Sequence, residues 1–401
     1  MFHSGRHFLQ IPGPTNIPDR VLRAMDRPII DHRGPKFAQL ALEVFSGLRS
    51  LVQSSGPVVM FPASGTGAWE AAIVNTLSAG DQVLAFETGQ FSTLWKNLAE
   101  RMGLQVKFVP GTWRRGVDPE EVETLLKADK GHAFKAVMVV HNETSSGVKC
   151  RLAEIRRAMN RANHPALLMV DTISSLASSD YRHDEWEVDV TIGGSQKGLM
   201  LPPGLSFNAI SEKALRANKS AKLPRAYWDW EDMLKQNTAG FFPYTPPTAI
   251  LYGLREALSM LQEEGLPNVF ARHRRHGEAT RAAVRAWGLE IVCERPEEYS
   301  DTVTAVFMPP GHDADQFRKV VLEKFDMSLG AGLAKLQGKV FRIGHLGSLN
   351  DLMLAGTLAG VEMGLALAGV PYRKGGVLAG LDCLVSANST NRAAPAAVEA
   401  V

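Results

Sequence analysis

Residues 166–171 read Ala-Leu-Leu-Met-Val-Asp, and residues 188–198 read Val-Asp-Val-Thr-Ile-Gly-Gly-Ser-Gln-Lys-Gly. Each stretch begins with a short run of mostly apolar residues, which is typical of a strand buried on both faces. The first run ends in a carboxylate, Asp171, and the second is followed by an amine, Lys197, among small residues. In a parallel sheet, chemistry collects at the carboxyl ends of the strands. The two stretches therefore predict a parallel sheet whose carboxyl edge carries functional groups.

Similar runs recur on both sides of these stretches, and segments with helical periodicity separate them. With strands at 166–170 and 188–192, further strands are expected at residues 58–61, 83–86, 106–109, 136–140 and 205–210. Helices are expected up to residue 77, over 91–102 and 152–162, and from Asp118-Pro119 onward. This alternation predicts an α/β fold with a mostly parallel, seven-stranded sheet covered by helices.

After about residue 245 the pattern changes to that of a smaller α+β domain. Helices are expected at residues 248–264, 268–287, 313–325 and 352–367, and strands at residues 289–292, 302–308 and 340–343. The resulting domain prediction is an N-terminal arm at 1–25, a large domain at 26–262, a small C-terminal domain at 263–377 and a flexible tail at 378–401. The tail is rich in Ala, Ser and Asn, a composition typical of frayed termini.

The bulk composition excludes several classes of protein. The chain has 401 residues and a formal net charge of +2, so no field of one sign points to nucleic acid or to an acidic membrane. Cys150, Cys293 and Cys383 form no C-x-x-C pair, which argues against a zinc site and a disulfide framework. The first residues lack the apolar run of a signal peptide, and no apolar stretch is long enough to span a membrane. We expect a cytoplasmic protein.

Lys197 and Asp171 are the first candidates for chemistry. A lysine in a semi-buried pocket has a lowered pKa and can act as a nucleophilic amine, although a surface lysine in a glycine-rich turn stays possible. A carboxylate at the end of a buried strand needs a partner. For Asp171 that partner is either the pyridine nitrogen of pyridoxal 5′-phosphate or a loop that the carboxylate caps through Thr172 or Ser174.

Two further motifs fit the same cofactor. Ser64-Gly65-Thr66-Gly67 lies between a strand and a helix, where backbone N–H groups can bind a phosphate, but an ordinary helix cap is an alternative. Because Glu70 stands where the third glycine belongs, this is not a dinucleotide-binding motif. Arg342 lies in an apolar strand and could bind a substrate carboxylate or form a structural ion pair.

The histidines of the small domain are not expected to bind a metal. His345 follows the strand of Arg342 and is expected to be structural. His273 and His276 lie one turn apart among arginines, a pattern that indicates the solvated face of a basic helix. No metal site is predicted.

Four candidate features occur in a fixed order: the phosphate-binding turn at Ser64–Gly67, Asp171, Lys197 and Arg342. In this order the sequence resembles the class V aminotransferases, which are fold-type I pyridoxal-phosphate enzymes. Within them it is most similar to the serine–glyoxylate and alanine–glyoxylate aminotransferase group. The stretches that carry the resemblance are residues 12–18 (PGPTNIP), 31–33 (DHR), 63–70 (ASGTGAWE), 141–148 (HNETSSGV), 194–198 (GSQKG), 242–247 (FPYTPP) and 341–344 (FRIG).

The resemblance implies a role for each matching residue. Lys197 would form the Schiff base, Asp171 would bind the pyridine nitrogen, and Arg342 would hold the substrate carboxylate, with Arg33 at the site mouth. Further cofactor contacts are implied for Ser64, Gly65, Thr66, Phe91, Ser145, Gln196, Tyr244 and Thr245. Tyr244 and Thr245 would reach the phosphate of the neighbouring subunit, and Arg33 could also act across the interface of a homodimer.

The implied reaction is the transfer of an amino group from L-serine to glyoxylate, which gives hydroxypyruvate and glycine. Alanine and aspartate are alternative donors. A remote alternative is a cysteine desulfurase-like lyase of the same fold, which would catalyse a different reaction. The expected partners are small amino acids and 2-oxo acids, without nucleic acid or membrane.

Overall fold

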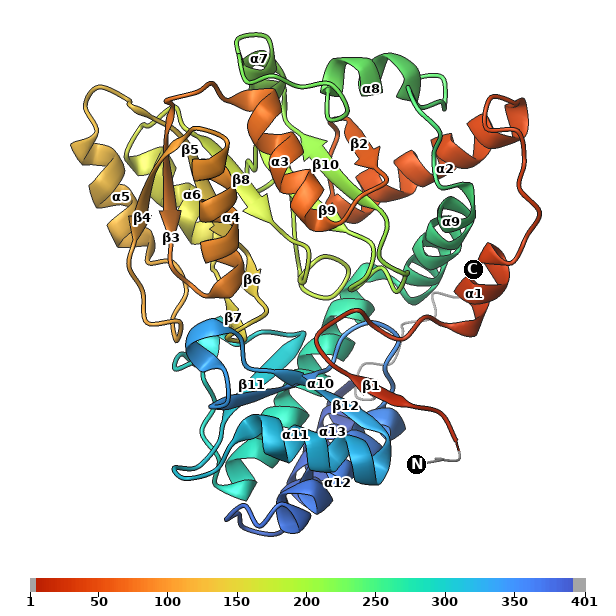
Figure 1. Cartoon of the computed structure of the whole chain (residues 1–401), viewed down its shortest axis with the longest axis vertical. Coiled ribbons are helices and arrows are strands. Elements are labelled where there is room, and N and C mark those ends of the chain that lie inside the picture. The colour runs from red at the N-terminus through yellow and green to blue at the C-terminus, as the bar shows by residue number, and fades with distance from the viewer. Residues whose placement is uncertain (1–4, 392–401) are drawn as a thin grey trace, which may run out of the picture.

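The computed structural model describes residues 5–391. Figure 1 shows a large α/β body and a smaller body beneath it, each built around its own sheet. The large sheet has seven strands, which in spatial order are β2 (Val58–Phe61), β10 (Ser206–Ile210), β9 (Val190–Gly194), β8 (Leu167–Asp171), β5 (Phe134–Val140), β3 (Gln82–Phe86) and β4 (Gln105–Val109). Only β10 runs antiparallel to its two neighbours, which confirms the predicted mostly parallel sheet.

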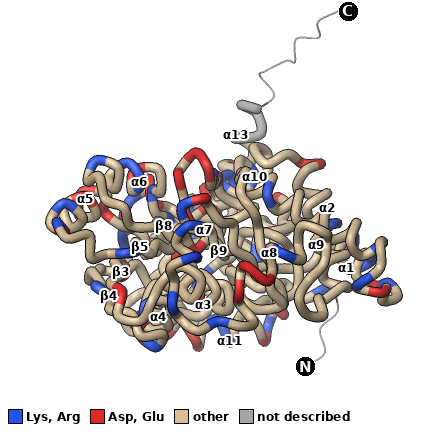
Figure 2. Tube along the Cα trace, turned by 90° about the horizontal axis from the view of Figure 1, so that it is seen from above, with Lys and Arg blue, Asp and Glu red and all other residues tan. Residues whose placement is uncertain are grey.

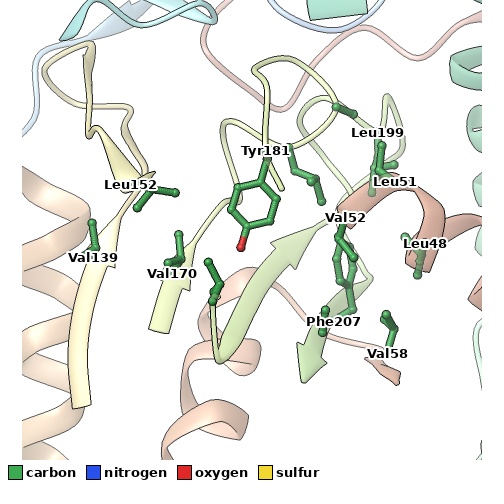
Figure 3. Close-up of a cluster of buried hydrophobic side chains, with 14 of the residues drawn as sticks. Leu48, Leu51, Val52, Val58, Val139, Leu152, Val170, Tyr181, Leu199 and Phe207 are labelled. Carbon is green, nitrogen blue, oxygen red and sulfur yellow. The ribbon is translucent and has the colours of Figure 1, made fainter. Parts of the chain in front are cut away.

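Helices cover both faces of this sheet because neighbouring residues of each strand point to opposite sides. In β8, Leu168 and Val170 face one core and Leu167 and Met169 the other. Helices α2 (Pro35–Val52), α5 (Pro119–Ala128), α6 (Leu152–Arg161) and α9 (Thr248–Glu264) contribute to the first core, part of which Figure 3 shows. Helices α3 (Gly65–Thr76), α4 (Gln90–Arg101), α7 (Glu212–Asn218) and α8 (Trp230–Asn237) contribute to the second. Burial on both faces explains why the inner strands are mostly apolar, whereas Gln105 and Lys107 of the edge strand β4 are exposed.

The small body contains a four-stranded sheet in the order β1 (Phe8–Gln10), β12 (Met327–Ala331), β13 (Val340–Gly344) and β11 (Val303–Phe307). Its helices are α10 (Leu266–Trp287), α11 (Ala314–Phe325), α12 (Asp351–Leu367) and α13 (Gly376–Asn391). Strand β1 belongs to this sheet although it is the first element of the chain. The chain then passes between the two bodies and continues into α1 (Asp19–Met25) on the large one (Figure 1).

Two predictions about the small body are wrong. Residues 289–292 do not form a strand, since the only pairing there is an isolated bridge between Ile291 and Val306. The segment predicted as a flexible tail is helical as far as Asn391, because Val377, Leu381 and Leu384 recur at helical spacing and pack into the small core. Residues 392–401 of that prediction lie outside the described residues.

The predicted domain limits stay predictions. Helices α9 and α10 lead from one body to the other with only Gly265 between them. Within the described residues no helix combines the length and apolarity that crossing a bilayer requires. Figure 2 shows basic and acidic residues interspersed along the trace, in line with the small net charge.

Candidate active site

A cavity of about 260 Å³ opens at the carboxyl edge of the large sheet. It is lined by Gly13, Pro14, Ser64, Gly65, Thr66, Trp69, Phe91, Val140, Asn142, Thr144, Asp171, Ile173, Ser174, Gln196, Lys197 and Pro203. A larger hollow of about 820 Å³ lies between α2 and α9, where the charged residues Glu43 and Arg255 pair with each other. We therefore take the smaller cavity, with its lysine and carboxylate, as the candidate site.

Lys197 lies in the turn after β9 and is only 8% exposed. Its Nζ donates a hydrogen bond to the carbonyl oxygen of Pro12, and its own carbonyl accepts one from Thr15 Oγ1 at 3.1 Å. Gly13 has a φ of +103°, and a Cβ there would lie 2.2 Å from Lys197 Cδ, so only glycine fits. Burial, aided by the nearby Arg342 guanidinium, lowers the pKa of Lys197 to about 7. Near neutral pH the amine is thus substantially uncharged and nucleophilic.

Asp171 is the last residue of β8 and is 4% exposed. Its Oδ1 accepts a hydrogen bond from the backbone N–H of Ile173 at 2.7 Å, and its Oδ2 accepts one from Trp69 Nε1 at 2.9 Å. Burial raises the pKa of Asp171 to about 7, against the effect of these two donors. The carboxylate does cap its own loop, through the backbone N–H of Ile173 rather than through Thr172 or Ser174. It also lines the cavity.

The turn Ser64–Thr66 places the start of α3 at the cavity wall. Ser64 is the N-cap residue by position, but its side chain makes no capping hydrogen bond. The first-turn N–H groups of a helix have no partners within the helix and favour an anion. A Cβ at Gly65 would lie 2.1 Å from Ile173 Cδ1, which explains the glycine there. Because the Ser64 side chain does not cap the helix, the N–H groups at the start of α3 can bind an anion such as phosphate.

Two further predicted residues, Phe91 and Gln196, line the cavity. Gln196 Oε1 is buried and has no hydrogen-bond partner among the described residues, so it is free to accept a bond from a ligand. Ser145, for which a cofactor contact was also predicted, does not line the cavity. Its hydroxyl donates to Glu143 Oε1 at 2.7 Å and accepts from the backbone N–H of Gln90 at 2.9 Å.

Arg342 is buried on β13, and its side chain bonds to two carbonyl oxygens. Nε donates to Ala331 O at 2.7 Å, and Nη1 donates to Thr144 O at 2.8 Å, next to the cavity. Burial lowers the pKa of Arg342 to about 10, against the attraction of the Glu143 carboxylate, so the group stays charged at neutral pH. Within residues 5–391 Arg342 forms no ion pair. The alternative prediction, a structural ion pair, is therefore not supported. A buried cation of this kind fits a carboxylate ligand.

Besides Ser145 and Arg342, which lie behind the cavity wall, three more predicted residues do not line the cavity of their own chain. Tyr244 stacks on Tyr227 with ring centroids 4.3 Å apart, and Thr245 follows it in the segment before α9. Arg33 is exposed in the segment between α1 and α2. Their action in a neighbouring subunit's site stays a prediction.

The histidines behind the site are buried, and one prediction about them is wrong. His345 bonds to Thr304 Oγ1 and to the Asp301 carbonyl, as expected of a structural histidine. His273 and His276 are fully buried instead of solvated. His273 bonds to the Val269 carbonyl and His276 to Asp351 Oδ1. The solvent-facing side of this stretch is formed by the neighbouring arginines, such as the exposed Arg274. Within the described part of the chain no cluster of His, Cys, Asp or Glu could hold a metal.

Several residues that line the cavity were not predicted from the sequence, chiefly Trp69, Gly13, Asn142 and Thr144. Trp69 stands in the Ala63–Glu70 motif one helical turn after Gly65, and that spacing was the available signal. Gly13 lies in a Pro-Gly-Pro segment that becomes part of the site only through the path of the chain between the two bodies.

The model of the family described as Aminotransferase class-V matches residues 7–339. The chain belongs to this family. This class V aminotransferase is similar to a serine–glyoxylate aminotransferase from Methylorubrum extorquens, with 50% identity over 97% of this chain and 98% of that protein. It is also similar to an L-aspartate–glyoxylate aminotransferase from Paracoccus denitrificans, with 48% identity over 91% of this chain and 92% of that protein.

The fold of this class V aminotransferase agrees with that of solved relatives. The crystal structure of an alanine–glyoxylate aminotransferase from Nostoc sp. matches it with a TM-score of 0.85 and 30% identity, over 91% of this chain and 96% of that one. Like other members of the family, the protein acts on small amino acids and oxo acids.

A desulfurase would need a reactive cysteine at the site, and the cysteines here lie elsewhere. None of Cys150, Cys293 and Cys383 lines the cavity. Burial raises the pKa of the Cys150 thiol to about 12 and that of Cys293 to about 11, which leaves both unreactive.

Proposed function

We propose that this class V aminotransferase uses pyridoxal 5′-phosphate to transfer the amino group of L-serine to glyoxylate. The observation that carries the proposal is the convergence of three groups on one cavity. These are a buried lysine with a lowered pKa, a carboxylate fixed at the end of the neighbouring strand, and an uncapped helix start.

The residues present fit pyridoxal phosphate. The N-terminus of α3 at Ser64–Thr66 would hold the phosphate, and Asp171 would face the ring nitrogen. Phe91 would pack on the ring, and the free Gln196 oxygen would accept a hydrogen bond from the ring's hydroxyl side. Bound pyridoxal phosphate supplies an electron sink that stabilises negative charge on the substrate's α-carbon.

The protein's own groups would then bind the substrate and move its protons. Lys197 would hold the cofactor through its Nζ, and the free amine would be the base that takes the proton from the substrate α-carbon. Arg342 binds the carboxylate next to the reacting carbon. Serine and glyoxylate both carry such a carboxylate, so one arginine serves both half-reactions.

The donor preference follows from the charges at the cavity. Among the lining residues of the described part of the chain Lys197 alone is cationic, and the guanidinium of Arg342, bonded to the lining residue Thr144, is assigned to the α-carboxylate. An aspartate side chain would need a second cation, which Arg33 could supply only from another subunit. The small hydroxymethyl group of serine needs none. Serine is also the donor named for the Methylorubrum relative, while aspartate and alanine, named for the other two, are the alternatives.

Steady-state kinetics with glyoxylate as acceptor tests this preference. We expect kcat/KM to be highest for serine, followed by alanine and then aspartate. A kcat/KM for aspartate about tenfold above that for serine, which is about 1.4 kcal/mol in transition-state binding, would assign the chain to the aspartate-specific enzymes instead.

We further propose a homodimer with shared active sites. The segment of Tyr244 and Thr245 and the exposed Arg33 lie outside their own chain's cavity, which supports their use by a partner. The partner's Tyr244 and Thr245 would add donors to the phosphate that α3 alone does not provide.

A further inference from the structure

The Asp171 carboxylate receives one side-chain hydrogen bond that the proposed cofactor chemistry does not itself require. Trp69 Nε1 donates to Asp171 Oδ2 at 2.9 Å, while the backbone N–H of Ile173 holds Oδ1. The indole N–H can only donate, so this contact favours a carboxylate that accepts and disfavours one that is protonated at Oδ2.

The indole is held in place from behind. Trp69 is 3% exposed and stacks on Trp95, with ring centroids 5.8 Å apart and an interplanar angle of 13°. Trp95 lies one turn after Phe91 on α4, and Trp69 lies one turn after Gly65 on α3. The two helices that present the phosphate cradle and the ring-stacking residue thus also fix the direction of the N–H bond.

We propose that Trp69 is a positioning residue that keeps Asp171 ionised, so that the proton shared by this carboxylate and the cofactor's ring nitrogen stays on the nitrogen. The inference rests on the proposed function. A hydrogen bond to a charged acceptor in a buried site is worth enough to move a proton equilibrium about tenfold or more. Without it the carboxylate becomes more basic and takes the proton, and the ring becomes a weaker electron sink.

The direct test compares Trp69→Phe with Trp95→Phe. Both replacements keep an aromatic ring in the same stack, but the N–H of Trp95 has no hydrogen-bond partner within the described residues. Each holoenzyme would be loaded with pyridoxal phosphate labelled with ¹⁵N in the ring, and solid-state NMR would report protonation of that nitrogen. We expect the ratio of protonated to unprotonated nitrogen to fall about tenfold in Trp69→Phe and to stay as in wild type in Trp95→Phe.

Equal nitrogen shifts in the wild type and Trp69→Phe would overturn the role of Trp69, as would an equal change in Trp95→Phe. A wild-type protein that takes up no pyridoxal phosphate would instead overturn the proposed function. The two failures are therefore distinguishable.

A second measurement does not depend on the folding of the Trp69 variant. In protein labelled with ¹⁵N-tryptophan, the seven indole signals would be compared between wild type and Asp171→Asn. One indole signal is expected to move strongly, because the asparagine amide replaces a charged acceptor. If no indole signal moves, the indole–carboxylate contact is not formed and the proposal is wrong.

Discussion

Replacement of Lys197 with alanine is expected to lower kcat for serine–glyoxylate transamination by a factor of about 10³ to 10⁴. The amine is the base that the site provides for the α-proton, and its lowered pKa keeps it in the basic form near neutral pH. The variant should also lose the visible absorption of covalently held cofactor. Stopped assays of hydroxypyruvate formation and an absorption spectrum measure both effects.

Lys213→Ala is the matched control for this change. Lys213 is half-buried, and burial lowers its pKa too, but its Nζ donates to the carbonyl of Ala166, just before the start of β8 and away from the cavity. Its loss should leave kcat and the spectrum unchanged. Added methylamine should restore part of the activity of Lys197→Ala, because a small amine can enter the space and act as base. Full activity of the alanine variant without added amine would contradict this role for Lys197.

Replacement of Asp171 with asparagine is expected to lower kcat by a factor of about 10² to 10³, since the site loses the charge that stabilises a protonated ring. The amide keeps the shape and the bond from Ile173, so cofactor should still bind. Asp189→Asn is the control. Asp189 is equally buried and pairs with Arg156 at 3.2 Å, at the opposite end of the sheet, and its loss should leave kcat nearly unchanged.

The same two variants are expected to have opposite effects on stability. The pKa of Asp171 is about 7 in the cofactor-free protein, above the value of about 3.9 for an unfolded chain. The folded state therefore binds more protons between these values, and its stability falls as the pH rises from about 4 to about 7. At about pH 8, cofactor-free Asp171→Asn should melt above the wild type and Asp189→Asn, which breaks a buried pair, below it. If Asp171→Asn melts below the wild type there, burial does not destabilise the ionised carboxylate as its raised pKa indicates.

Much of the large body could be predicted because its signals are local. The inner strands are short, mostly apolar runs whose alternate residues enter two cores, as Leu168 and Met169 do. Asp171 and Lys197 could be placed at one edge because parallel strands share a direction. Helices α1, α2, α7 and α8 were not predicted although their patterns are local, whereas two strands that escaped prediction depend on distant partners. Strand β1 pairs with β12, more than 300 residues away, and β12 itself contains a glycine and a serine that weaken its pattern.

The candidate site divides in the same way. The helix start at Ser64–Thr66 and the lysine turn follow from sequence spacing. The contact of Lys197 with Pro12 and that of Arg342 with Thr144 join segments 185 and 198 residues apart, so only the folded chain shows them. Ser145 was expected to face the cofactor, but the buried Glu143 carboxylate two residues earlier takes its hydroxyl.

The lysine that holds the cofactor can be identified by reducing the purified protein with borohydride and mapping the modified peptide by mass spectrometry. Reduction fixes pyridoxal phosphate to the amine that holds it. We expect a single phosphopyridoxyl group on Lys197, loss of the visible absorption band and loss of serine–glyoxylate transamination in the same proportion. A modification on another lysine, or a protein that carries no such group and still transaminates, would contradict this expectation.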